Sequence, residues 1–268
     1  MNITEKVYKR LTIKVTLTGF SYCVFDTLQQ KVETVKEVDF KLFPKTRKVE
    51  EHYARAFRDP WELRDSFDEI LVLHDHNLNT FVPKSLFDEQ HMGSYLQYNT
   101  KVFESDFFDF DALANYEMNN VYIPYVNINN YLLDQLGTFN YKQANSILVS
   151  KLLDRSKNID EKQVFVHFSD SKFELVVIQN QKLLLFNSFD YQTKEDFIYY
   201  LLFTAEQLNL NPEHFRLQLL GNISEDSELF KIAYKFVRNV SLLDVSDLQK
   251  NNPFSTEQNL KHFILFQS

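Results

Sequence analysis

The feature that most constrains the fold is an order of strand-like and helix-like segments that occurs twice along the chain. In each half, three strand-like runs joined by short turns precede a helix, a strand, a second helix and a further strand. Short turns favour antiparallel pairing of the first three runs, whereas strands separated by helices favour parallel pairing. The repeated order therefore predicts an α/β protein with two tandem units, each a mixed sheet with flanking helices.

The expected segments follow from the spacing of apolar residues and from helix and turn signals. In the first half they are the strands 11–17, 21–27, 32–40, 69–74, 80–82, 121–126 and 138–143, the helices 46–58, 83–98, 128–136 and 146–155, and a helical turn over 61–67. In the second half they are the strands 164–168, 173–178, 182–188, 215–220, 240–243 and 262–266, a helix with a capping box of Thr193 and Asp196, and a helix capped by Ser224.

A polar stretch separates the two halves. Asp154–Lys162 is charged and almost without apolar residues, which is typical of a linker. We therefore place the first domain at residues 1–158 and the second, more compact domain at residues 159–268. Within the first domain, an acidic and aromatic insertion is expected near residues 101–118.

Glycine is scarce in this chain, with four residues where average usage would give about 19. No two of Gly19, Gly93, Gly137 and Gly221 lie close together in sequence. Motifs that need two nearby glycines are therefore absent, among them the P-loop, the dinucleotide-binding turn and the nucleophile elbow. Their absence excludes the most common sequence signatures of nucleotide-binding and hydrolase sites.

The chain is acidic, with a formal net charge of −8 and a sequence pI of about 5.4. Because phosphate backbones are anionic, we expect no nucleic-acid partner. One basic cluster is followed at once by two glutamates, and we interpret it as a solvated helix start. It consists of Lys41, Lys45, Arg47 and Lys48.

Cys23 is the only cysteine, so intrachain disulfides are excluded, and its apolar neighbours predict a buried strand position. The first residues lack the apolar core of a signal peptide. The longest apolar stretch, residues 197–203, is far below the roughly 18 residues that a membrane span requires. We therefore expect a cytoplasmic location and no membrane span.

Two stretches of the second half carry a family resemblance. Val166–Leu175 with Asn180–Leu184 is similar to the first hairpins of PilM-type and FtsA-type proteins, and Leu219–Ser224 resembles their adenosine-loop strand. Over nearly its full length the chain resembles the Bacteroidetes family called domain of unknown function 3822. The resemblance implies the fold of the actin-like ATPase superfamily, which consists of two tandem ribonuclease-H-like subdomains with a nucleotide site.

The chain departs from the motifs of that superfamily, whose phosphate-binding turns contain Asp-x-Gly. In the second half His167 and Ser169 occupy the Asp and Gly places, and the first-half turn keeps Gly19 but offers no acidic residue. The adenosine loop has Asn222 where a second glycine is usual, although asparagine tolerates a positive φ. The resemblance therefore implies a degenerate nucleotide site. Its positions are Gly19, His167, Ser169, Asp170, Gly221 and Asn222, with no catalytic residue and with ATP and Mg not favoured as cofactors.

Three short patterns have the residue spacing of a metal site or a catalytic site, but each gives weaker evidence for function than the family resemblance. His74-Asp75-His76 would place two imidazoles on one face of a continued strand, but nothing nearby supplies an obvious third ligand. We interpret these as solvated histidines at a strand end, and we expect no metal site. Asp88 and His91 have helical spacing, and they are weaker candidates for a metal site. Ser169–Lys172 has the S-x-x-K pattern of penicillin-binding proteins, but it lies in a predicted hairpin turn rather than on a helix.

The segment Glu104–Asp111 alternates acidic and aromatic residues. Such a segment can be a docking surface, because aromatic side chains supply contact area while the charges keep the surface soluble. The alternative, which we favour, is an insertion that packs its aromatic side chains onto its own domain.

Retained architecture with altered phosphate-binding turns favours a non-catalytic, cytoplasmic actin-like protein that acts as an assembly or protein-interaction module. A protein partner is then expected, and self-association is left open. A second hypothesis is a divergent ATPase or kinase-like enzyme that uses the cleft between the two subdomains, with Asp170, Glu174 and Asp26 as acids on the metal side. A third is a ligand-binding protein without chemistry that uses His167 and Ser169.

Overall fold

The structure, a computed structural model, describes residues 6–42, 48–58, 63, 65–250 and 252–268. Its internal contacts divide the chain into two compact units. Unit 1 comprises Met1–Ile147 with Ser268, and unit 2 comprises Leu148–Gln267. The division falls within helix α4 (Ala144–Arg155), whereas the polar stretch in the sequence suggests a boundary after residue 158.

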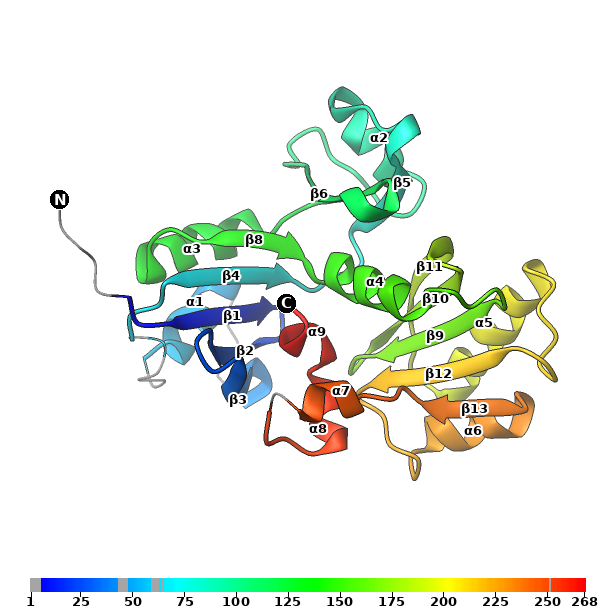
Figure 1. Cartoon of the computed structure of the whole chain (residues 1–268). Helices are drawn as coiled ribbons and strands as arrows, with labels where there is room; N and C mark the ends of the chain where they lie inside the picture. The colour runs from blue at the N-terminus through cyan, green and yellow to red at the C-terminus, as the bar shows by residue number, and fades with distance from the viewer. Residues whose placement is uncertain (1–5, 43–47, 59–62, 64, 251) are drawn as a thin grey trace. The chain divides into compact units, whose positions relative to one another are not determined.

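Unit 1 contains a five-stranded mixed sheet in the order β3-β2-β1-β4-β8 (Figure 1). The first three strands pair antiparallel, and the β1–β4 and β4–β8 pairs are parallel. Ile13 at the centre of the sheet shares one core with Tyr53 of α1 (Val49–Ala56) and Ile128 of α3 (Val126–Leu136). The strands are β1 (Lys9–Val15), β2 (Gly19–Asp26), β3 (Lys31–Asp39), β4 (Glu69–His74) and β8 (Asn140–Gln143).

Unit 2 contains a second five-stranded sheet in the order β11-β10-β9-β12-β13 (Figure 1). Every residue of β9 is buried, as in a strand that is covered on both faces. Val166 of this strand shares a core with Phe197 of α5 (Lys194–Gln207) and Ala233 of α6 (Glu228–Phe236). The strands are β9 (Gln163–Phe168), β10 (Lys172–Gln179), β11 (Lys182–Asp190), β12 (Arg216–Gly221) and β13 (Asn239–Leu242).

The two sheets have the same strand order and the same pairing directions. Numbered within its own unit, each sheet reads 3-2-1-4-5, with an antiparallel meander followed by two parallel strands. This topology confirms the predicted fold class, an α/β protein with two tandem ribonuclease-H-like units.

Unit 1 differs from unit 2 by an insertion between β4 and α3, which forms a three-stranded sheet in the order β5-β7-β6. Figure 1 shows this small sheet and α2 beyond the ends of β4 and β8. The acidic and aromatic stretch 101–118 is one part of the insertion. The three strands are β5 (Asn79–Pro83), β6 (Asp109–Leu113) and β7 (Met118–Tyr122), and Val82, Leu96 and Val121 form their buried core.

The helix that the sequence predicts over residues 83–98 is broken into short pieces. The structure has 3₁₀ turns at Lys84–Leu86 and Glu89–His91 and one short α-helix, α2 (Met92–Leu96). Asp88, between the two turns, has an extended backbone, and its side chain accepts a hydrogen bond from a backbone N–H of the second turn. Aspartate favours such capping over a helix interior, which explains the interruption.

The N-terminus of α6 lies at Ser227 rather than at the predicted Ser224. Ser227 Oγ accepts a hydrogen bond from Phe230 N at 3.2 Å, whereas Ser224 contributes only its carbonyl oxygen, which accepts from Ser227 Oγ at 2.7 Å. The predicted capping box of α5 is confirmed, because Thr193 and Asp196 each accept from the backbone N–H of the other.

The last predicted strand, residues 262–266, is helical. A capping box of Ser255 and Gln258 begins α8 (Thr256–Lys261), and α9 (Phe263–Phe266) follows directly. Three consecutive residues of α9 are buried, so the run lacks the alternation that would separate a strand from a short helix. The other short helices are η1 (Phe40–Leu42), η5 (Ala114–Tyr116) and α7 (Ser246–Gln249).

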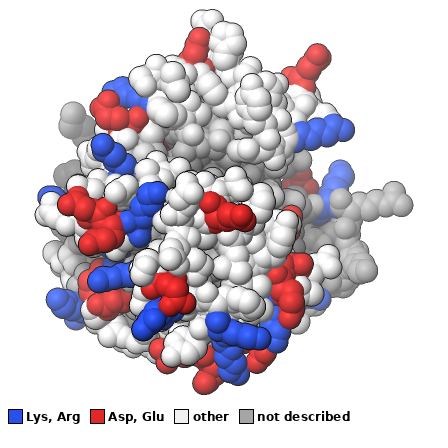
Figure 2. Space-filling view, turned by 90° about the vertical axis from the view of Figure 1, so that its right-hand side faces the viewer, with Lys and Arg blue, Asp and Glu red and all other residues white. Residues whose placement is uncertain are grey.

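Cys23 lies buried in β2, as predicted, and burial raises the pKa of its thiol to about 12. No helix within the described residues is long and apolar enough to cross a membrane. Of the basic cluster, Lys45 and Arg47 lie outside the described residues, as do parts of the predicted turn over 61–67. On the face shown in Figure 2, Lys and Arg side chains are interspersed with Asp and Glu side chains.

Candidate functional site

Five of the six predicted nucleotide-site residues lie together in unit 2, at the carboxyl ends of the parallel neighbours β9 and β12. Gly221, the last residue of β12, pairs with Phe168, the last residue of β9. Ser169 N donates across the turn to Lys172 O at 2.9 Å, which closes the β9–β10 hairpin. The sixth residue, Gly19, belongs to unit 1. The five are His167, Ser169, Asp170, Gly221 and Asn222.

Gly221 is required by the backbone itself. Its φ is +87°, and a Cβ atom at this position would lie 2.2 Å from Phe168 O and 2.7 Å from Phe168 N. The next residue, Asn222, donates from its backbone N–H to Phe168 O at 2.8 Å and from Nδ2 to Asp170 Oδ1 at 3.1 Å. The corner is therefore held together by its own backbone and by one side-chain contact.

A cluster of three polar side chains, His167, Lys172 and Glu174, lies beside this corner. His167 and Glu174 face each other across β9 and β10, and His167 Nδ1 donates to Glu174 Oε2 at 2.8 Å. Lys172 Nζ donates to the other carboxylate oxygen, Oε1. His167 and Glu174 are both buried. Both oxygens of the Glu174 carboxylate are therefore engaged by side chains of the same sheet.

In unit 1, the hairpin turn that leads to Gly19 also makes its hydrogen bonds within the protein. Thr16 N donates to Gly19 O at 3.0 Å, and Thr18 N donates to Thr16 Oγ1 at 3.2 Å. The buried Tyr53 hydroxyl donates to Thr16 O at 2.8 Å and lies 3.2 Å from Gly19 O. A Cβ atom on Gly19 would lie 2.3 Å from Val38 O, so close approach of β3 requires glycine here.

Asp26, one of the acids in the enzyme hypothesis, has a different role in unit 1. It ends β2, whereas Gly19 begins that strand, so the two residues lie at opposite ends of an eight-residue strand. Asp26 Oδ1 accepts from Leu28 N and Gln29 N, each at 2.8 Å, and so holds the β2–β3 turn. Turn capping of this kind is a common role for aspartate.

The prediction that His74 and His76 are solvated is wrong, because both are buried, as is Asp75 between them. Tyr125 N donates to His74 Nδ1 at 3.1 Å, and burial lowers the pKa of His74 to about 4, against a raising contribution from Asn129. Lys14 Nζ pairs with Asp75 Oδ2 at 2.9 Å. Among the residues that the structure describes, no group of three or more His, Cys, Asp or Glu side chains is placed to hold a metal ion.

Asp111 on β6 connects the insertion to the start of α4, a contact that the sequence did not suggest. Its Oδ2 accepts from Gln143 N at 2.8 Å and from the Ser146 hydroxyl, which also accepts from Asn120 Nδ2 at 2.9 Å. Burial raises the pKa of Asp111 to about 6, against the lowering effect of these hydrogen bonds. Nearby, Tyr141 OH donates to Asp109 Oδ2 at 2.6 Å.

As the pH falls into the mildly acidic range, protonation of Asp111 is expected to raise the free energy of unfolding of the wild type. The variant Asp111→Asn should not show this increase. Because the pKa in the fold, about 6, exceeds the usual 3.8, the folded chain binds this proton more readily than the unfolded chain. The gain is complete below the unfolded pKa and is lost as the pH rises through the folded one. At pH 5 it amounts to about 1 kcal/mol. Urea unfolding of both proteins at pH 7.5 and 5.0 measures it, and equal changes would contradict it.

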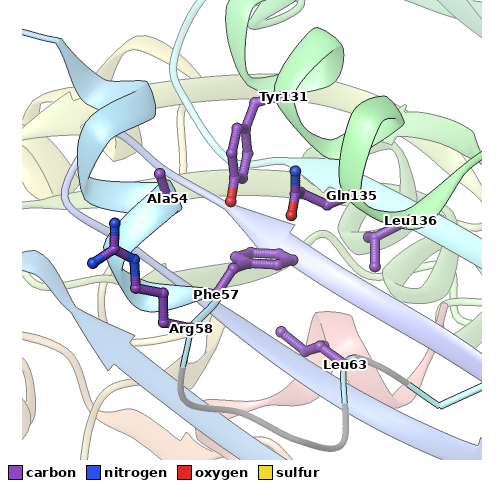
Figure 3. A pocket seen from close by; sticks show the side chains of 7 residues that line it. All are labelled: Ala54, Phe57, Arg58, Leu63, Tyr131, Gln135 and Leu136. Atoms are coloured by element: carbon purple, nitrogen blue, oxygen red, sulfur yellow. The ribbon is translucent and has the colours of Figure 1, made fainter.

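A pocket of about 500 Å³ lies in unit 1 between α1 and α3 (Figure 3). The Phe57 and Tyr131 rings meet there edge to face, with centroids 5.7 Å apart. Burial raises the pKa of Tyr131. None of the predicted nucleotide-site residues lines this pocket. The lining residues are Ala54, Phe57, Arg58, Leu63, Tyr131, Gln135 and Leu136.

The family model described as "Protein of unknown function (DUF3822)" matches residues 1–240. The chain belongs to this family. The match confirms the resemblance to this family that the chain shows over nearly its full length. A search of curated proteins finds no match.

Two solved structures resemble this DUF3822 chain over nearly its full length. One is a protein from Bacteroides thetaiotaomicron with an actin-like ATPase fold and unknown function. It has 20% sequence identity and a TM-score of 0.81, and the alignment covers 100% of this chain and 99% of that one. The other is the PilM–PilN type IV pilus biogenesis complex, with 12% identity, a TM-score of 0.60 and coverage of 98% and 97%. At these identities the likeness shows the fold alone, the actin-like ATPase fold.

Proposed function

We propose that this DUF3822 chain is a non-catalytic, cytoplasmic actin-like protein that acts as an assembly or protein-interaction module. The observation that supports this proposal is the cluster that the buried His167 and Glu174 form with the partly buried Lys172. Phosphoryl transfer from a nucleotide depends on carboxylates that hold a metal ion or orient the attacking water. Here a histidine stands at the place of the acid, and the nearby Glu174 is already engaged by two side chains.

The backbone of the two hairpin turns supports the same proposal. A phosphate-binding turn directs backbone N–H groups toward the ligand. In unit 2 Ser169 N and Asn222 N donate to backbone carbonyls, and in unit 1 Thr16 N and Thr18 N donate within their own turn. These residues do not fit a magnesium–nucleotide complex, and we propose that the chain uses neither ATP nor Mg²⁺ as a cofactor.

A protein partner is part of the proposal. PilM, which has a similar fold, was solved in complex with PilN. For this chain we propose that the actin-like frame serves as a scaffold for binding another protein.

Calorimetry with Mg-ATP tests the proposal. We expect no binding heat up to millimolar nucleotide and no phosphate release, because His167 stands at the place of the acid, Glu174 is engaged by two side chains, and Ser169 N and Asn222 N donate to backbone carbonyls. The matched variant His167→Asp, which restores an acid at this place, is expected to remain without turnover while Ser169 and Glu174 are unchanged. Micromolar affinity with turnover in the wild type would replace the proposal with the ATPase or kinase-like alternative.

A further inference from the structure

The insertion of unit 1 holds most of the net negative charge of the chain. Residues 79–122 contain seven Asp and Glu and two Lys, a net charge of −5 out of −8 for all 268 residues. Glu89 and Glu104 among these acids are exposed. The segment that carries this charge forms a small sheet with no counterpart among the described residues of unit 2, so the shared architecture of the two units does not require it.

Aromatic side chains of the insertion divide into a packed set and an exposed set. Phe108 and Phe110 pack against the core around Val82 and Leu96, which confirms the favoured interpretation for these two residues. Phe107 is 55% exposed, so for this residue the interpretation is wrong.

Phe103 and Phe107 are presented by an ordered loop. Phe103 is 53% exposed, although its backbone N–H donates to Asp106 Oδ2 at 2.8 Å and Asp106 N donates back to Phe103 O at 3.1 Å. Val102 and Phe108, at either side, pack onto the insertion core. The loop is therefore held at two points, and the Phe103 and Phe107 rings between them are exposed to solvent. Because the backbone of the loop is already ordered, binding a partner through these rings would cost little further conformational entropy.

We propose that this loop of the insertion, with Phe103, Glu104 and Phe107 as its docking residues, binds a cationic, amphipathic segment of a protein partner. The inference rests on the proposed interaction role and names its surface and partner class. The aromatic rings would supply apolar contact area, and the surrounding acids would select a segment that carries Lys or Arg beside apolar side chains.

The positions of charge and aromatic residues favour this occupant over others. Lys101 Nζ lies 4.9 Å from the centre of the Phe103 ring, so the ring already accepts a cation on one face. The net charge of the insertion opposes binding of nucleic acid or of an anionic membrane surface. A second copy of this acidic chain would meet like charge, which makes it the less favourable partner.

The direct test uses a fluorescein-labelled peptide of alternating Leu and Lys blocks, together with a matched peptide in which Glu replaces every Lys. We expect the full chain to bind the cationic peptide, with an affinity that falls as salt is raised, and to ignore the acidic one. The double variant Phe103→Ala with Phe107→Ala should weaken binding at least tenfold. The single variant Glu104→Lys should weaken binding severalfold.

Matched aromatic residues elsewhere provide the control. Tyr199 and Phe203 on α5 of unit 2 are 62% and 50% exposed, and replacing both by alanine should leave the peptide affinity unchanged. If the Phe103 and Phe107 double variant binds the cationic peptide as tightly as the wild type, the proposed docking surface is wrong, even if the chain proves inert toward ATP. Self-association that this variant abolishes would overturn the partner class. ATP turnover with intact peptide binding would overturn only the non-catalytic assignment.

Discussion

Replacing Glu174 by glutamine is expected to lower the free energy of unfolding by about 3 kcal/mol, since breaking a buried ion pair leaves the remaining charge poorly solvated. His167 and Lys172 both donate to this carboxylate within unit 2. Glutamine keeps the shape but brings two N–H donors to a place where donors already converge. Lys172, whose side chain is 14% exposed, then keeps its positive charge without the counter-charge of Glu174.

Urea unfolding followed by circular dichroism measures this loss, and hydrogen exchange of the β9 and β10 amides shows whether it is located there. The matched control is Glu228→Gln. Glu228 also bridges two lysines, Lys194 at 2.8 Å and Lys231 at 3.2 Å, but it is exposed to water. Solvent screens such a pair, so the urea midpoint of the control should hardly change. If Glu174→Gln and Glu228→Gln unfold at similar urea midpoints, burial of the Glu174 ion pair does not determine its contribution to stability.

The pairing directions of the strands in both sheets are predictable from the sequence because local connections determine them. Short turns bring consecutive strands together antiparallel, and helical connections return the chain in parallel. The burial of His74 and His76 is not predictable in this way. The Tyr122, Tyr125 and Tyr141 rings, each near one or both of these imidazoles, come from three later segments of the chain.

In the candidate site, too, some contacts are predictable from local sequence and others are not. A tight turn over Ser169–Ser171 makes His167 and Glu174 cross-strand neighbours, so hairpin register alone could have predicted their contact. Asp111 is different, because its partners Gln143 and Ser146 follow 32 and 35 residues later. A contact across that separation depends on how the insertion folds back onto α4, and no local signal in the sequence carries this information.

Gly221→Ala is expected to cost about 3 kcal/mol or more, as the sum of a strained backbone and a collision. The positive φ of +87° alone costs a residue with a Cβ about 1–2 kcal/mol. The new Cβ would also lie 2.2 Å from Phe168 O, which is backbone and cannot rotate away. Relief requires β9 and β12 to separate where Asn222 N bonds Phe168 O.

Gly137→Ala separates the two contributions. Gly137 ends α3 with a φ of +76°, but no atom lies within 4 Å of its hypothetical Cβ, so only the backbone strain of about 1–2 kcal/mol applies. Thermal and urea unfolding of both variants should therefore rank Gly221→Ala as the more damaging by a clear margin. Equal losses would mean that the strands part easily at this corner. With the expected ranking, the close packing of β9 against β12 explains why position 221 requires glycine, with no need for a nucleotide.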